Sequence, residues 1–329
     1  MGIMSNISTA IDLVKRYGPM TMAGYTKNRL HYGFLKNVLG KRFVEKDIHN
    51  YRMILDTKDL GISRALLFFG TREEDHKYIL EQEVKPGMTV LDLGANVGYY
   101  ALMECNLVGK DGFVYCMEPH PENYEQLQKN IKLNNMQDRV EFYHMGGSNK
   151  DSVEHLYVSA KSNQHSFCDT TGEKNISNLD GIAGKVEVKT VSINTFRKGK
   201  KNIDFIRMDI EGFEVEVFEG MIPALDEDPN FRPSVLFETH KPKYTPEHSL
   251  SKQLNELFDR GYYPKILISD ELPRAKFKEH GFTPDHTLRT DGITRGLYYN
   301  MPKEDVIKFT TEIGSVRGLF LEHESRKSN

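Results

Sequence analysis

Cysteine is scarce in this chain, with three among 329 residues. Cys105, Cys116 and Cys168 form no C-x-x-C pair and their number is odd, so neither a disulfide framework nor a zinc knuckle is expected. Long apolar runs are also missing, since none approaches the roughly 20 residues that cross a bilayer. A net charge of −3 argues against a protein that binds DNA through its overall charge. These absences predict a protein of the reducing cytoplasm.

The most informative segment is residues 90–100, in which an apolar, β-prone run leads into Asp-x-Gly-x-Asn-x-Gly and then into a helical pattern. Such a unit brings a nucleotide-like ligand close to the backbone, because glycine has no Cβ and tolerates positive φ. The next strand, 112–117, ends at Glu118. A carboxylate about 20 residues beyond the glycine turn can accept hydrogen bonds from both hydroxyls of an adenosine ribose. Together the two signals predict an adenosine-containing cofactor.

The polar residues of the turn favour S-adenosylmethionine over a dinucleotide. A dinucleotide site needs G-x-G-x-x-G, whose second glycine makes room for the pyrophosphate. Here Asn96 stands between Gly94 and Gly98, and the acidic Asp92 precedes the turn. A carboxylate repels a pyrophosphate but suits an ammonium and a sulfonium, while the turn amides suit the carboxylate of the same ligand. The alternative is that Asp92 and Asn96 only cap the following helix.

Beyond Glu118, strands and helices alternate as they do in a doubly wound sheet. Met145 and Gly146 are expected beside the adenine, and Tyr99 and Pro119 complete the predicted cofactor site. The polar segment 160–184 is long for a connection and predicts a lid or a disordered segment. The expected helices are 121–135, 213–221 and 250–260, and the expected strands are 139–145, 153–159, 185–193, 203–209, 234–240, 263–268 and 296–300.

These elements predict an α/β protein in three parts: an N-terminal appendage of helices and strands at 1–80, a Rossmann-like, mostly parallel catalytic domain at 81–302, and a helical tail at 303–329. Residues 15–46 carry eight basic side chains and one acidic one, and apolar residues recur among them at near-helical spacing: Leu30, Phe34, Leu35, Val38 and Leu39. We expect a helix that packs this apolar face on the catalytic domain. The alternative is peripheral contact with the inner membrane surface or with a phosphorylated glycan carrier.

Polar side chains follow the strands 203–209 and 234–240 at the ends where ligands bind in open α/β sheets: Asp209, Glu211, Glu238 and His240. They are expected around the methyl group of the cofactor, where a carboxylate or a histidine can take the proton of an attacking hydroxyl. Alternatively, Asp209 hydrogen-bonds loop amides and Glu211 caps a helix. The oxygen ligands suffice for a divalent ion, but no spacing demands one, and we predict no metal.

The chain resembles the FkbM-type SAM-dependent methyltransferases over roughly residues 51–240. The resemblance rests on VLDLGANVGYYA at 90–101, on Glu118-Pro119, and on the K/R-x-D-x-E-G-x-E pattern at 207–214. It implies a class I methyltransferase fold and O-methylation of hydroxyls, often those of sugars in glycans, glycolipids or natural products. It also implies a cofactor site and, at the reaction centre, Asp209 and Glu211; the cofactor site would comprise Asp92, Gly94, Asn96, Gly98 and Glu118.

Two positions depart from the family pattern: Asn194 replaces a common Asp, and Gln164-His165-Ser166 replaces a more serine-rich stretch. Because the second departure lies in the long segment expected to meet substrate, His165 and Ser166 are candidate substrate contacts. We expect a small-molecule or carbohydrate acceptor, which is lipid-linked in one interpretation. Two other functions stay open at this point. One is an RNA ribose 2′-O-methyltransferase, which would want a broad basic surface, and the other is a non-catalytic scaffold in a glycan-assembly complex.

Overall fold

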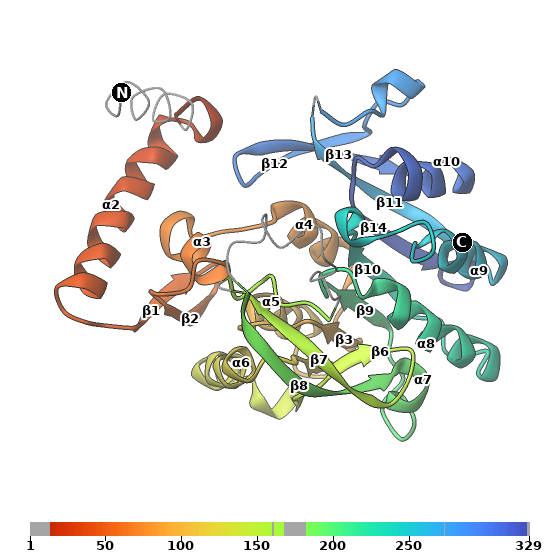
Figure 1. Cartoon of the computed structure of the whole chain (residues 1–329), viewed down its shortest axis with the longest axis horizontal. Helices are drawn as coiled ribbons and strands as arrows, with labels where there is room; N and C mark the ends of the chain where they lie inside the picture. Colours follow the sequence, from red (N-terminus) through yellow and green to blue (C-terminus); the bar gives the residue numbers. More distant parts are fainter. Residues whose placement is uncertain (1–13, 160, 168–181, 273, 328–329) are drawn as a thin grey trace.

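The computed structural model describes residues 14–159, 161–167, 182–272 and 274–327, and its centre is a nine-stranded sheet (Figure 1). The strand order is β12-β13-β11-β14-β10-β9-β3-β4-β5. Strands β10, β9, β3, β4 and β5 pair in parallel, and only β13 and β14 run against the other seven. The predicted mostly parallel α/β sheet is confirmed. The strands are β3 (Thr89–Leu93), β4 (Phe113–Met117), β5 (Val140–Tyr143), β9 (Phe205–Met208), β10 (Ser234–Glu238), β11 (Tyr262–Glu271), β12 (His286–Thr290), β13 (Ile293–Tyr299) and β14 (Val316–His323).

Helices cover both faces of the parallel half of the sheet, so its strands are apolar on both sides. Leu91 and Ile206 point into one core, while Val90 and Phe205 point into the other. The first core is closed by α8 (Glu214–Glu227), α9 (Ser251–Asp259) and α10 (Lys303–Ile307), with the short α7 (Ile193–Phe196) at its rim. The second is closed by α4 (Glu74–Glu83), α5 (Tyr99–Val108) and α6 (Pro121–Leu133). The carboxyl ends of β3, β4, β9 and β10 therefore open at one edge.

A small second sheet lies beside that edge, with the order β6-β8-β7. It consists of β6 (Gly146–Ser148), β7 (Ser152–Ser159) and β8 (Ile182–Ser192). The predicted antiparallel strand at 153–159 is confirmed, because β7 pairs antiparallel with β8. Residues 161–167 follow β7 directly, and a backbone bridge between Tyr157 and Ser166 folds them back over it. Residues 160 and 168–181 of the predicted lid, Cys168 among them, lie outside the described residues.

The N-terminal part consists of α2 (Pro19–Asn37), the hairpin of β1 (Phe43–Ile48) and β2 (Tyr51–Asp56), and α3 (Ile62–Phe69). Helix α2 packs on α3 through rings, since Tyr25 stacks on Phe69 at 5.0 Å between centroids. The prediction that the apolar residues at 30–39 pack on the catalytic domain is wrong for most of them. Leu30 is 72% exposed and Val38 65% exposed, and Phe34 and Leu39 are exposed as well. Of the five expected residues, Leu35 packs against the second core.

The C-terminal part is not the helical tail that the sequence predicted. After α10 and the π-helical segment η5 (Lys308–Ile313), the chain forms β14, which enters the sheet between β10 and β11. The strand expected near 296–300, which is β13, is therefore not the last. The short 3-10 helices are η1 (Gln137–Arg139), η3 (Lys241–Lys243), η4 (Lys278–His280) and η6 (Glu324–Arg326). None of the described helices combines the length and the apolar character that spanning a bilayer requires.

Candidate active site

The turn between β3 and α5 depends on glycine at its first position. Gly94 has a φ of 81°, and a Cβ built there would lie 2.1 Å from the carbonyl oxygen of Asp209. The turn is also tied to β4, because the N–H groups of Gly94 and Ala95 each donate to the Met117 carbonyl at 3.0 Å. The ends of β3, β4 and β9 therefore meet in one tight backbone cluster.

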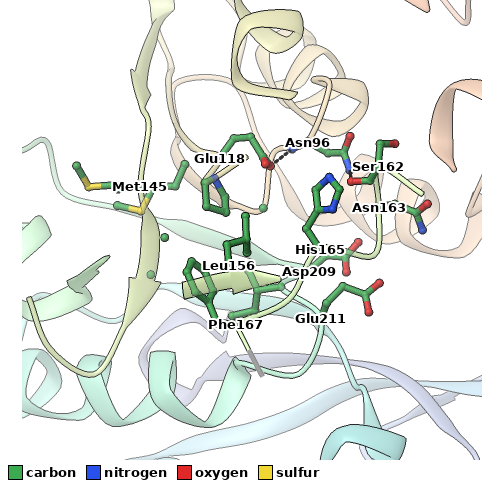
Figure 2. A pocket seen from close by; sticks show the side chains of 16 residues that line it. Asn96, Glu118, Met145, Leu156, Ser162, Asn163, His165, Phe167, Asp209 and Glu211 are labelled. Carbon is green, nitrogen blue, oxygen red and sulfur yellow. Dashed lines mark hydrogen bonds between the residues drawn. The ribbon is translucent and has the colours of Figure 1, made fainter. Parts of the chain in front are cut away.

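Glu118 stands at the end of β4 and holds the other side of this turn. One of its oxygens accepts a hydrogen bond from the backbone N–H of Asn96 at 2.8 Å (Figure 2). The other accepts from the backbone N–H of His120, also at 2.8 Å. Burial raises the pKa of the Glu118 carboxyl to about 7, although both backbone hydrogen bonds act to lower it. The glycine turn and the Glu118 carboxyl group, which the sequence predicted to act together, thus lie in contact. The carboxyl group is largely shielded from water.

A cavity opens between this turn, the ends of β4 and β9, and the segment 162–167 (Figure 2). Its free volume is about 50 Å³, whereas small-molecule sites usually offer about 300–1,000 Å³. Its wall includes most of the predicted site residues: Gly94, Asn96, Glu118, Pro119, Met145, Gly146, His165, Asp209 and Glu211. Leu156 and Phe167 fill much of the remaining space, and a Cβ on Gly146 would lie 2.7 Å from the Phe167 ring.

Three residues predicted to bind the cofactor do not line this cavity. Asp92 is fully buried beneath the turn, where its Oδ1 lies 3.2 Å from Nη1 of Arg207. Tyr99 faces the other way and donates its hydroxyl to the Arg72 carbonyl at 2.9 Å, and Gly98 abuts Leu127. The alternative interpretation, in which Asp92 or Asn96 caps the helix, is wrong, since no side chain caps the start of α5. Direct contact of Asp92, Gly98 and Tyr99 with a cofactor stays a prediction.

His165 and Ser166 occupy different positions although they are adjacent in sequence. His165 lines the cavity, accepts the Ser159 N–H at Nδ1 at 3.0 Å, and packs against the His120 ring with 4.1 Å between centroids and 34° between the ring planes. Burial lowers the pKa of His165 to about 3, so its ring is neutral at physiological pH. Ser166 is buried and donates its hydroxyl to the Glu211 carbonyl at 2.7 Å. Of the two predicted substrate contacts, His165 alone faces the cavity.

Arg207 is a residue that sequence reasoning missed as a site residue. From β9 its guanidinium donates to the Gly94 carbonyl at 3.1 Å, to Asp92, and to Oδ2 of Asp209 at 3.0 Å. Its Cζ lies 4.1 Å from the Tyr100 ring centroid. The basic first position of the K/R-x-D-x-E-G-x-E pattern was a signal for it. Arg207 fixes the glycine turn and Asp209 relative to each other.

The four predicted catalytic residues converge in one buried cluster. Nε2 of His240 lies 3.3 Å from Glu238 Oε1, 3.7 Å from Glu211 Oε2 and 3.8 Å from Asp209 Oδ1. Asp209 and Glu211 line the cavity, while Glu238 and His240 lie behind them and do not. Glu211 is held by Lys243, whose Nζ lies 2.6 Å from Oε2. Burial, together with the nearby Glu238 charge, raises the pKa of Asp209 to about 7.

Glu214, the last acid of the motif, orients His240 from behind. Its Oε1 lies 2.8 Å from Nδ1 of His240 and accepts the Gly212 N–H at 3.0 Å, and its Oε2 accepts the Tyr244 hydroxyl at 2.6 Å. Burial alone would raise the pKa of Glu214, but the His240 charge and these hydrogen bonds lower it. Burial would lower the pKa of His240, yet Glu214 and Glu238 raise it well above its ordinary value.

Arg317 of β14 closes the cluster on the side away from the cofactor cavity. It pairs with Glu238 through Nη1, and its Nη2 lies 3.1 Å from Oε1 of Glu73. Arg317 and Glu73 also line a larger cavity of about 650 Å³ between α2, α3 and the β12–β13 hairpin, with Arg72, Arg289, Asp291 and Arg295 in its wall. The acidic cluster therefore lies between two cavities.

Comparison with known proteins assigns the chain to a family. The model of the methyltransferase FkbM domain matches residues 92–264, more than half of the 329 residues. The chain belongs to the FkbM methyltransferase family. It is a methyltransferase of class I fold, and its cofactor is S-adenosylmethionine. The family expected from residues 90–101 and 207–214 is confirmed.

Individual relatives of this FkbM-family chain are distant. Hexuronic acid methyltransferase AglP of Haloferax volcanii is 26% identical over 174 residues, which are 51% of this chain and 62% of AglP. A protein-L-isoaspartate O-methyltransferase of Methanococcus aeolicus is 26% identical over 113 residues, 33% of this chain and 50% of that protein. Both matches span less than two thirds of the relative. The crystal structure of methyltransferase FkbM from Methylobacillus flagellatus aligns at 16% identity and a TM-score of 0.32, over 54% of this chain and 43% of that one.

Proposed function

We propose that this FkbM-family protein transfers the methyl group of S-adenosylmethionine to a hydroxyl of a sugar. The observation that carries the proposal is the position of Asp209 and Glu211, whose carboxylates lie in the wall of the cofactor cavity. A hydroxyl is a weak nucleophile, so its methylation needs a protein group that binds the hydroxyl and removes its proton. The two carboxylates are the groups placed to do so.

The residues around the cavity fit the cofactor by their chemistry. Glu118 offers a carboxylate at the strand end where a ribose is bound in this fold, and Gly94 and Gly146 let the backbone approach. When bound, the cofactor supplies an electrophilic methyl carbon. The protein's own contribution is to hold the turn through Arg207, to orient the acceptor oxygen at Asp209 and Glu211, and to exclude water with Leu156 and Phe167.

Entry of the cofactor requires the wall at 162–167 to give way, because about 50 Å³ is too little for it. Opening this wall breaks local contacts, among them the bridge of Ser166 to Tyr157, the Ser166–Glu211 hydrogen bond and the Ser162 hydroxyl bond to Asp59 at 2.8 Å. The Ser162 carbonyl also accepts from Asn96 and Asn123. The wall would open for the cofactor and close over it, as loops above reactive sites often do.

A sugar acceptor is supported by the relative AglP, a hexuronic acid methyltransferase. The larger cavity behind Arg317 fits this chemistry, since polar side chains including Arg72, Arg289 and Arg317 line it. Helix α2 and the residue that follows it support a lipid-linked form of the acceptor, because they expose basic and aliphatic side chains together: Lys27 and Leu30 in the helix, and Val38 after it. We propose that this surface meets an anionic membrane or carrier.

The proposal is tested with radiolabelled S-adenosylmethionine and a panel of sugars, uronic acids and lipid-linked oligosaccharides. We expect label in an alkali-stable ether, because O-methyl ethers of sugars survive base whereas methyl esters of carboxylates do not. Alkali-labile label would contradict O-methylation of a hydroxyl, and label in RNA would contradict the sugar acceptor. The Glu211→Gln variant should lose transfer while still binding S-adenosylhomocysteine.

A further inference from the structure

His240 presents a buried, unsatisfied nitrogen to the acidic cluster. Within the described residues its Nε2 makes no hydrogen bond, although its side chain is nine-tenths buried. Three carboxylate oxygens lie at 3.3–3.8 Å from it, from Glu238, Glu211 and Asp209. A buried polar atom without a hydrogen-bond partner destabilises the fold. A cation shared between this nitrogen and the carboxylates would satisfy all of them together.

The opposite side of the ring has the support that a metal-binding histidine needs. Nδ1 of His240 is held at 2.8 Å by Glu214, which is itself fixed by Tyr244 and the Gly212 N–H. Histidine ligands usually donate their second ring N–H to such a carboxylate, which fixes the tautomer and aims the free nitrogen at the metal. Glu214 therefore acts on the site through His240.

The spacing of the atoms suits a small divalent cation. Ligands about 2.1 Å from a magnesium-sized ion lie about 3.0 Å apart when adjacent and about 4.2 Å apart when opposite. Nε2 of His240 lies 3.3 Å from Glu238 Oε1 and 3.8 Å from Asp209 Oδ1, and one ligand atom from each of the three residues falls within 4.8 Å of the others. We propose that Asp209, Glu238 and His240 bind a divalent cation such as Mg²⁺ or Mn²⁺.

The neighbouring groups favour this set over a second one. Glu73, His76 and Glu238 also lie within 4.8 Å of one another. Glu238 belongs to both sets, and its Oε1 pairs with Arg317 in either case, so the other residues decide between them. Glu73 is itself engaged by Arg72, by Arg317 and by the Tyr100 hydroxyl at 2.7 Å. In the first set Oδ1 of Asp209 is free of the Arg207 contact, which uses Oδ2. Two carboxylates and one imidazole are donors that Mn²⁺ accepts well.

The role of the cation, unlike its binding, rests on the proposed function. Asp209 is both a ligand of the site and part of the cofactor-cavity wall, so the ion would lie beside the acceptor. It would coordinate the acceptor hydroxyl oxygen and make its O–H bond easier to break. The O–H bond would break with its proton passing to the Glu211 carboxylate, and the electron pair left on oxygen would form the new O–C bond to the methyl carbon. The S–C bond would break in the same step, with its electron pair staying on the sulfur of S-adenosylhomocysteine, the leaving group.

The test is titration of the chelator-treated full chain with Mn²⁺, followed by electron paramagnetic resonance of the free ion. We expect one Mn²⁺ per chain in the wild type. Asp209→Asn and His240→Asn should each weaken binding at least tenfold, and Glu214→Gln should weaken it about 10- to 100-fold. His248→Asn is the matched control, because His248 also pairs with a glutamate, Glu216, at 2.8 Å but outside the cluster; it should bind as the wild type does.

Each result bears on the site separately from the activity. Wild-type protein that binds no Mn²⁺, or variants that bind it as tightly as wild type, would overturn the site. Circular dichroism of each variant shows whether it is folded, and the wild-type result stands even if one variant is not. Mn²⁺ binding without any sugar methylation would leave the site and remove the proposed function. Undiminished methylation after complete removal of metal would remove the role given to the cation.

Discussion

Gly94 lies so close to Asp209 that a Cβ on the glycine would sit 2.1 Å from the aspartate's carbonyl oxygen. The contact joins the first strand of the cofactor site to the strand that carries the catalytic motif. The turn therefore needs glycine for two reasons: the φ of this residue is 81°, and there is no room for a Cβ. The turn that we propose holds the cofactor and the motif that we propose holds the acceptor therefore share one backbone contact.

Gly94→Ala should reduce affinity for S-adenosylhomocysteine at least tenfold and lower stability by more than the strain alone. A left-handed residue with a side chain costs about 1–2 kcal/mol, and displacement of β9 adds to this. Gly87→Ala is the matched control, since Gly87 has a φ of 87° with nothing within 4 Å of its Cβ position. Calorimetric titration and thermal unfolding measure both effects. Equal losses of affinity and stability in the two variants would show that backbone strain, and not the contact with Asp209, causes the effect of Gly94→Ala.

Binding of S-adenosylhomocysteine should weaken as the pH falls below about 7. Burial raises the pKa of Glu118 to about 7 in the free protein, and ribose hydroxyls donate to the ionised carboxylate. The favourable form is therefore present above this pH and lost below it, with affinity falling toward tenfold per pH unit. Titrations between pH 5 and 9 measure this. Glu118→Gln should bind more weakly with a flatter profile, and an unchanged profile would assign the titration to another group.

Arg207→Met should destabilise the protein by about 3–5 kcal/mol, because it leaves Asp92 as an uncompensated buried carboxylate. Arg207→Lys should recover only part of this loss, since an ammonium cannot span Asp92, Gly94 and Asp209 as the planar guanidinium does. Denaturant unfolding gives the free energies. The comparison variant is Arg260→Met, whose partner Asp226 is exposed; a loss as large there would refute the role of burial.

The triple variant Lys27→Glu, Arg29→Glu, Lys36→Glu should lose binding to anionic phosphatidylglycerol vesicles. Each basic side chain near such a surface contributes about 1 kcal/mol, so reversal of three should reduce partitioning by more than 100-fold. The matched control reverses Lys110, Lys129 and Lys132 on the catalytic domain. Vesicle sedimentation separates the cases. Retention of binding in the α2 variant would remove the membrane role of this helix.

Phe167→Ala should speed association with S-adenosylhomocysteine several-fold. The Phe167 ring lies against Gly146 and at 5.1 Å from the Phe213 ring centroid, in the wall that leaves the cavity about 50 Å³. A smaller side chain lowers the cost of opening that wall. Surface plasmon resonance yields the association rate. A rate equal to that of wild type would mean that the cofactor enters by another path.

The sequence was most informative where function depends on neighbours along the chain. The turn at 94–98, Glu118 and the acids after β9 are local patterns, and the structure brings Gly94, Glu118, Asp209 and Glu211 to one cavity. The role of Asp92 was harder to predict, because its partner Arg207 is 115 residues away and burial, not spacing, decides which way a carboxylate points. The exposed Leu30 and Val38 have a similar cause: helical spacing predicts a face but not its partner.

The place of β14 has a consequence for the order of events during synthesis. Strands β3, β4, β9 and β10 precede residue 239, but β10 pairs on its far side with residues 318–321. Until that stretch leaves the ribosome, β10 is a bare apolar edge, the kind of surface on which nascent chains aggregate. Arg317 arrives with the same stretch and pairs with Glu238 and Glu73, whereas the cations that pair with Asp209 and Glu211 precede it in the chain. A ribosome stalled before residue 316 would thus hold a chain with its cofactor turn encoded and Glu238 still without its arginine.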